Sequence, residues 1–141
     1  MSLRVRQLSL GVKIFALILM STVVIILFIL ADSPLFAQGQ LLSHLIRWQP
    51  YNKAYESMIL GVNVVMGWML WQASADPIRH RLMIAYGISA NLIHAVIMFI
   101  FAMFTPTESL HAIGDVLFLG IPALVVLGLH YRTRDRSIIE G

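Results

Sequence analysis

The chain has 141 residues, of which 59% are hydrophobic and only 12% are charged. Soluble domains are about 45–50% apolar and about 25% charged, so this composition indicates an integral membrane protein without a sizeable soluble domain. Cysteine is absent, which excludes disulfides, thiolate metal sites and cysteine nucleophiles. The ten Lys and Arg residues outnumber the seven Asp and Glu. They flank apolar runs, a pattern typical of membrane topology and not of nucleic-acid binding.

A first spanning helix is predicted over about residues 14–32. Three basic residues and no acidic one precede an apolar run of 18 residues from Ile14 to Ala31. The same pattern could begin a cleaved signal peptide, whose apolar region has about 7–15 residues, whereas a spanning helix needs about 20. The length of the run therefore favours an uncleaved helix.

An amphipathic pattern over residues 40–48 predicts a short interfacial helix, with a plain loop as the alternative. Trp48, Tyr51 and Tyr55 follow this pattern. Such clustered aromatic residues are typical of the belt that anchors a protein at the membrane surface.

Three further spanning helices are predicted over about residues 54–71, 82–104 and 109–131. Gly61 and Gly67 lie on the first of these helices. Both are small enough to allow close approach of a neighbouring helix.

The ends of these helices carry recognisable signals. Asp76-Pro77 suits the N-cap and first position of the helix over 82–104, and Thr107-Glu108 suits the start of the last helix. Pro122 frees a carbonyl inside the last helix, so a kink is expected there.

The predicted fold is therefore all-α, an integral membrane antiparallel four-helix bundle in a single domain. With both termini in the cytoplasm, eight of the ten cations lie inside and only Arg47 and Lys53 lie outside. This distribution satisfies the positive-inside rule. The short connections between the later helices favour antiparallel neighbours.

Six polar residues of the predicted spanning helices form the candidate binding site: Glu56, Asn63, Asn91, His94, His111 and Asp115. At about 1.5 Å per residue, His94 lies about 18 Å from the inner end of its helix and Asp115 about 9 Å from the outer end of the next. In a hydrocarbon core about 30 Å thick, these two depths nearly coincide. An unpaired ionisable group at mid-bilayer costs several kcal/mol, so we expect the set to face inward, with His94 near Asp115.

Several roles fit this polar set. It could be a structural clasp between helices, a proton relay, or a site for the head group of a quinone or lipid. Two histidines and carboxylates are suitable metal ligands, but no tight ligand motif is present, which disfavours a metal. Haem bound between His94 and His111 has no further support in the sequence.

Four segments carry a resemblance to known proteins: Glu56, Asp76-Pro77, Asn-Leu-Ile-His-Ala at 91–95 and His-Ala-Ile-Gly-Asp-Val at 111–116. Over about residues 54–131 the chain resembles an uncharacterised bacterial family of small four-helix membrane proteins. More loosely, it is similar to the DoxX-like group. The resemblance implies a four-helix bundle in a bacterial inner membrane and singles out Glu56, His94, His111 and Asp115. The DoxX likeness implies a quinone-linked or redox-accessory role by analogy of fold.

Three functions are consistent with these features, and no strong catalytic motif suggests that the chain is an enzyme by itself. The first is an accessory subunit of a larger membrane complex of respiratory, redox or oxygenase type, or a homo-oligomer. The second is a module that binds a quinone or lipid beside His94 and Asp115. The third is a proton-coupled carrier of a small solute. The lipid bilayer is the expected environment in all three cases.

Overall fold

Every regular element in the described part of the chain is a helix, which confirms the all-α class. The computed structural model describes residues 2–137, without the side chains of Asp115 and of residues 134–137. The elements are α1 (Leu3–Leu30), η1 (Pro34–Phe36), α2 (Leu41–Ile46), α3 (Lys53–Ala73), α4 (Arg81–Phe104), η2 (Pro106–Ala112) and α5 (Asp115–Ser137).

Three helix boundaries differ from the sequence prediction by several residues, namely the start of α1 and both ends of α5. Helix α1 begins at Leu3 and not near residue 14, because its basic first turns are helical and Ser2 caps them by accepting from the Val5 amide. Apolar content marks where a helix can enter lipid, whereas its backbone can continue beyond that boundary. At the other end of the chain, α5 begins at Asp115, since residues 106–112 form the separate 3-10 helix η2.

The Asp76 cap also belongs to a different element from the one expected. The Asp76 carboxylate accepts from the Arg79 amide at 3.1 Å and stabilises the turn that precedes α4. Helix α4 begins four residues later than Pro77, at Arg81, with His80 at its N-cap position.

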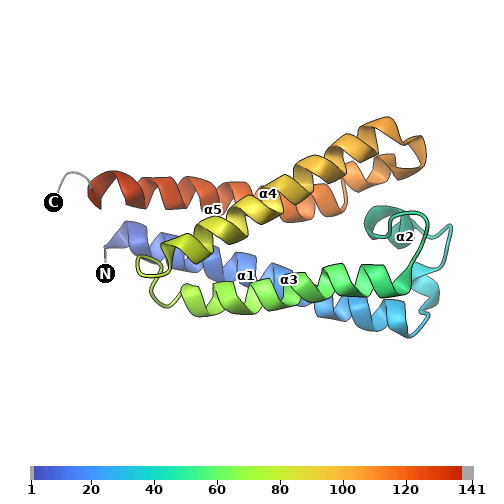
Figure 1. Cartoon of the computed structure of the whole chain (residues 1–141), viewed down its shortest axis with the longest axis horizontal. Coiled ribbons are helices and arrows are strands. Elements are labelled where there is room, and N and C mark those ends of the chain that lie inside the picture. Colours follow the sequence, from blue (N-terminus) through green and yellow to red (C-terminus); the bar gives the residue numbers. More distant parts are fainter. Residues whose placement is uncertain (1, 138–141) are drawn as a thin grey trace.

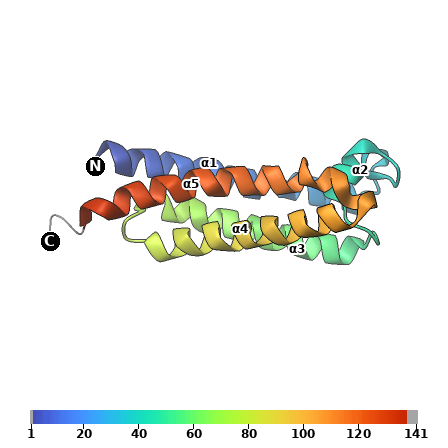
Figure 2. The ribbon, with the colours of Figure 1, turned by 90° about the horizontal axis from the view of Figure 1, so that it is seen from above.

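The four long helices α1, α3, α4 and α5 run in alternating directions (Figure 1). The start of α1, the turn between α3 and α4 and the end of α5 therefore lie at one end of the molecule (Figures 1 and 2). The short elements lie at the opposite end, which we call the cap end, where α2 packs against η1 and η2. The segment between α1 and α3, which contains η1 and α2, is called the cap.

The hydrophobic core fills the half of the molecule that contains the termini. It combines the first two-thirds of α1, the second half of α3, the first half of α4 and the first half of α5. Its members are Leu8, Val12, Phe15, Ala16, Leu19, Met66, Leu70, Ala73, Ile84, Ile88, Leu119, Ala123 and Val126.

Close packing in this half requires Gly67, as the sequence suggested. A Cβ atom on Gly67 would lie 2.8 Å from the Ala16 carbonyl oxygen and 2.9 Å from Met20 Cγ on α1. Gly61, in contrast, has open space at its Cβ position. Only one of the two glycines therefore mediates helix contact within the chain.

Three helical segments of the described chain are long and apolar enough to cross a membrane: Leu3–Leu30, Arg81–Phe104 and Pro106–Thr133. No more than 33% of the most apolar stretch of any of them is buried. The remaining apolar side chains point outward, which in water would be strongly unfavourable over so large an area. These segments therefore indicate a membrane protein.

Candidate functional site

A cavity of about 1140 Å³ occupies the half of the molecule nearest the cap end. All four long helices contribute to its wall, together with residues 45–50, which include the end of α2 and the segment after it. Most of the lining is apolar, including Ile25 of α1, Leu60 of α3, Met98 of α4 and Leu117 of α5. Ligand pockets in proteins typically measure about 300–1,000 Å³ and combine an apolar wall with a few polar groups. This cavity is slightly larger than that range and has such a lining.

The cavity exists because α3 and α4 diverge after a short region of contact. Near the turn that joins them, Leu70 packs at the position where Gly87 has no side chain, and the Asn91 amide lies 3.2 Å from Met66 Sδ. Beyond these contacts the two helices separate toward the cap end (Figure 1). The next polar residues along each helix, Asn63 and His94, line the cavity.

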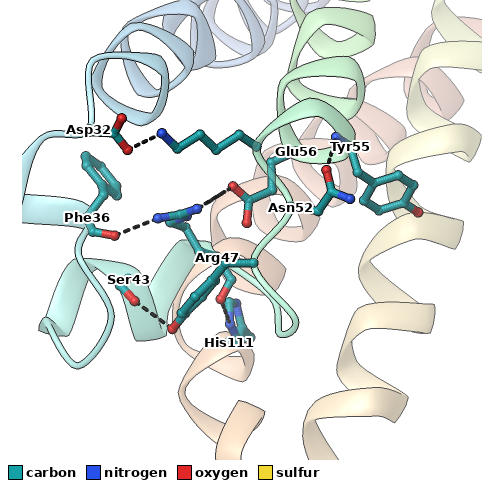
Figure 3. Close-up of polar contacts among 10 residues, drawn as sticks. Asp32, Phe36, Ser43, Arg47, Asn52, Tyr55, Glu56 and His111 are labelled. Atoms are coloured by element: carbon teal, nitrogen blue, oxygen red, sulfur yellow. Dashed lines mark hydrogen bonds and ion pairs between the residues drawn. The ribbon is translucent and has the colours of Figure 1, made fainter.

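The cap end of the cavity carries a partly desolvated ion pair. Arg47 Nε and Nη2 each lie 3.0 Å from Glu56 Oε2, and the two side chains are only 10% and 12% exposed. Figure 3 shows how Arg47 also reaches back to the start of the cap: Nη1 donates to the Phe36 carbonyl at 2.7 Å. Its guanidinium lies 4.6 Å from the centre of the Tyr51 ring. The charges of Arg47 and Glu56 are thus neutralised by each other.

A second polar group holds η2 against the cap. His111 is fully buried and stacks on Trp48, with 4.1 Å between ring centres. Its Nε2 lies 3.2 Å from the Arg47 carbonyl oxygen and 3.2 Å from Glu108 Oε2. A backbone carbonyl only accepts, so this hydrogen bond requires the hydrogen on Nε2. His111 does not line the cavity, and its contacts serve to join the cap to η2.

Gly114 allows the cap to approach the start of α5. A Cβ at this position would overlap the backbone of Leu45, at the carbonyl oxygen. The end of α2 therefore packs directly on the η2–α5 junction, and this contact closes the cap end of the cavity.

The deep end of the cavity lies in the middle of the molecule and is also polar. Thr22, Asn63 and His94 are the lining residues of α1, α3 and α4 that lie farthest from the cap. Asn63 is two helical turns beyond Glu56, which corresponds to roughly 10 Å along α3. The cavity is therefore an apolar chamber with polar groups at both ends.

The six candidate residues are thus distributed over several environments. Glu56, Asn63 and His94 line the cavity, whereas His111 lies behind its cap. Asn91 is buried outside it and donates to the Gly87 carbonyl at 2.8 Å, besides its contact with Met66. The expected proximity of His94 to Asp115 concerns a side chain outside the described residues. Among the five candidate side chains that the structure describes, three therefore line the chamber and two make separate packing contacts.

The main polar contact that sequence reasoning missed is Arg47 with Glu56. The sequence pattern places Arg47 among the cations outside the membrane and Glu108 at a helix start, and it predicts no side-chain contact for either. One signal was available: Glu56 is the only acidic residue of the apolar helix α3, and Arg47 is the nearest arginine in the chain. Among the described side chains, no group of three or more His, Asp or Glu is arranged to hold a metal ion.

The fold and the cavity define this protein as an all-α protein with three helical segments long and apolar enough to span a membrane and a mostly apolar cavity between its helices. Residues 10–137 match the model of a family of unknown function, DUF6632, and the chain belongs to that family. No curated protein and no solved structure matches the chain.

Proposed function

We propose that this protein binds an amphipathic membrane molecule, of the quinone or lipid class, in the cavity between its long helices. The observation that carries the proposal is the chamber of about 1140 Å³ with an apolar wall and polar groups at both ends. Such a chamber suits a molecule with a long apolar part and a compact polar head. The looser likeness to the DoxX group points in the same direction by analogy of fold.

The proposal includes a bilayer topology, an antiparallel four-helix bundle in which α3 is the fourth span. Helix α3 has 21 residues, so it is about 31 Å long and matches a hydrocarbon core about 30 Å thick. The end of the molecule that contains the termini also carries Arg4, Arg79, Arg81 and Arg132. By the positive-inside rule this end faces the cytoplasm of a bacterial cell, with the protein in the inner membrane.

Access from the bilayer is consistent with the shape of the cavity. Tyr55 of α3 and Phe101 of α4 line the cavity and are 59% and 57% exposed. They lie on the side where the two helices diverge, so a lipid-soluble molecule could enter between them without crossing water.

Filling the cavity tests the proposal. Met98→Trp places a large side chain in the cavity wall, whereas Ile93→Trp adds the same ring to the exposed outer face of the same helix. Each protein is purified in a mild detergent and its bound small molecules are identified by native mass spectrometry. We expect the wild type and Ile93→Trp to retain one defined lipid-soluble molecule and Met98→Trp to lose it. Identical bound molecules in all three would assign them to the outer surface and refute the proposal.

A second candidate, an accessory subunit of a larger membrane complex, is favoured by the outer face of α3. Gly61 has open space at its Cβ position, and the neighbouring Met58, Val62 and Val65 are all at least 59% exposed. Small residues on a lipid-facing surface suit close contact with another helix. Native mass spectrometry of particles from native membranes tests this candidate: co-purifying subunits that Gly61→Leu releases would support it, and a monomer would refute it.

A further inference from the structure

The Asn63 carboxamide is a polar group of the cavity with unused hydrogen-bonding capacity, as is Glu56 Oε1 nearer the cap end. The carboxamide lines the deep end, and within the described residues no hydrogen bond reaches it. Other polar groups of the wall have protein partners: Asn52 accepts from the Tyr55 amide, and Thr22 donates to the Leu19 carbonyl at 2.7 Å.

An unused carboxamide at this depth is unfavourable unless something binds to it. A polar group transferred to an apolar environment without a partner costs roughly 1–3 kcal/mol in proteins. A carboxamide offers two N–H donors and one carbonyl acceptor. Asn63 can therefore hold a ligand group that accepts, donates or does both.

The charge of the cavity wall restricts the head group further. The charged lining residues are Arg47 and Glu56, which neutralise each other at the cap end. Deeper than Glu56, the described lining contains no Asp, Glu, Lys or Arg. With His94 in its neutral form, a charged head group placed beside Asn63 would leave water without a counter-charge, which is strongly unfavourable in an apolar site.

We propose that the ligand of this cavity has an uncharged, hydrogen-bonding head group that binds to Asn63 at the deep end, beside His94. The inference rests on the proposed function and names its ligand class. The apolar chain of the ligand then lies along the wall toward the cap end. Two kinds of membrane molecule share this chemistry, namely quinones and neutral glycerolipids. Anionic phospholipids do not share it.

Binding is measured with the purified full-length chain in detergent. Trp48 lines the cavity and precedes α3, whereas Trp68 and Trp71 lie on α3 outside the cavity lining. The double variant W68F/W71F therefore leaves Trp48 as the fluorescent reporter. Decyl-1,4-benzoquinone quenches its fluorescence on binding. Dioleoylglycerol, a neutral lipid, and dioleoylphosphatidylglycerol, an anionic lipid, are then added as competitors. Displacement of the quinone by dioleoylglycerol shows that the site accepts a glycerolipid as well as a quinone.

Asn63→Leu in this background is expected to weaken decylbenzoquinone about tenfold, as loss of one or two hydrogen bonds would. Asn63→Ser, which keeps a hydroxyl, is expected to fall between Leu and the wild type. Asn91→Leu is the matched control, because Asn91 is buried outside the cavity; it should lower stability but leave the affinity unchanged. Since Asn63 has no protein partner to lose, Asn63→Leu should retain helicity and thermal stability.

The outcomes separate the inference from the proposed function. If the quinone or dioleoylglycerol binds to the wild type with the same affinity as to a folded Asn63→Leu variant, the inference is wrong while the cavity is still a binding site. Displacement of the quinone by dioleoylphosphatidylglycerol at least as effectively as by dioleoylglycerol also overturns it. If no probe binds to the wild type, and its native mass spectrum contains no bound small molecule, the proposed function itself fails.

Discussion

Arg47 and Glu56 illustrate how a charged pair can be retained at the edge of an apolar chamber. Each side chain is close to nine-tenths buried, and such burial is unfavourable for either charge alone. The guanidinium also donates from Nη1 to the Phe36 carbonyl and lies over the Tyr51 ring. The pair therefore joins the cap to α3 without presenting a net charge to the cavity.

Removing one partner of this pair should cost more than removing both. Arg47→Met leaves the Glu56 carboxylate buried without its partner, and we expect a loss of about 3 kcal/mol in unfolding free energy. The double variant R47M/E56L should recover most of this loss. Lys53→Met serves as the control, because the Lys53–Asp32 ion pair is largely exposed and should contribute less than about 1 kcal/mol. Unfolding in mixed SDS micelles, followed by circular dichroism, measures these changes, and equal losses for the single and double variants would contradict this account.

Reasoning from residue type located part of the candidate site. Glu56, Asn63 and His94 stand out as polar residues within apolar helices, and the structure places them on one cavity wall. His111 stood out for the same reason, yet it packs behind the cap. Depth along a helix could be estimated from sequence position, but the direction in which each side chain points depends on how the helices pack.

At the scale of the helices, small residues allow close helix packing in one half of the molecule, and the cavity lies in the other half. Gly67 brings α1 and α3 together, and Gly87 lets α4 approach Leu70 of α3. Both contacts lie in the half of the molecule that contains the termini. Toward the cap end the larger side chains of α3 and α4 meet no such gap, and the helices diverge around the cavity.

Two glycines of α3 should respond in opposite directions to the same substitution. Gly67→Ala places a Cβ atom 2.8 Å from the Ala16 carbonyl oxygen, so we expect a loss of about 1–3 kcal/mol from overpacking. Gly61→Ala meets open space and should raise stability by up to about 1 kcal/mol, because alanine favours the helix. Thermal unfolding of both variants beside the wild type makes the comparison. Equal effects of the two substitutions would show that the α1–α3 contact is looser than described.

The whole molecule has one basic end and one capped end, and this polarity underlies the proposed topology. In the alternating arrangement of the long helices, Gln38 of the cap and Ala75 of the α3–α4 turn lie at opposite ends (Figure 1). Both residues are exposed. If α3 crosses the bilayer, these positions face opposite compartments.

The absence of cysteine allows a direct test of this topology. Gln38→Cys and Ala75→Cys each introduce one thiol into a chain that has none. A membrane-impermeant maleimide added to intact cells or sealed spheroplasts should label position 38 at once and position 75 only after the membrane is opened. Labelling of both positions from the same side would exclude α3 as a span, and the reverse order would invert the proposed orientation.

By itself, the sequence determined the environment and the secondary structure of this protein. Long apolar runs bounded by cations can be satisfied only by helices in lipid, because backbone groups in hydrocarbon must bond within their own segment. It also marked most of the helix ends, but not the start of α1 at Leu3 or the two ends of α5. The tertiary structure alone decided that half of the interior is packed and half is an open chamber. This difference arises from which side chains of α3 and α4 meet and from a cap that folds back over their ends, neither of which follows from local pattern.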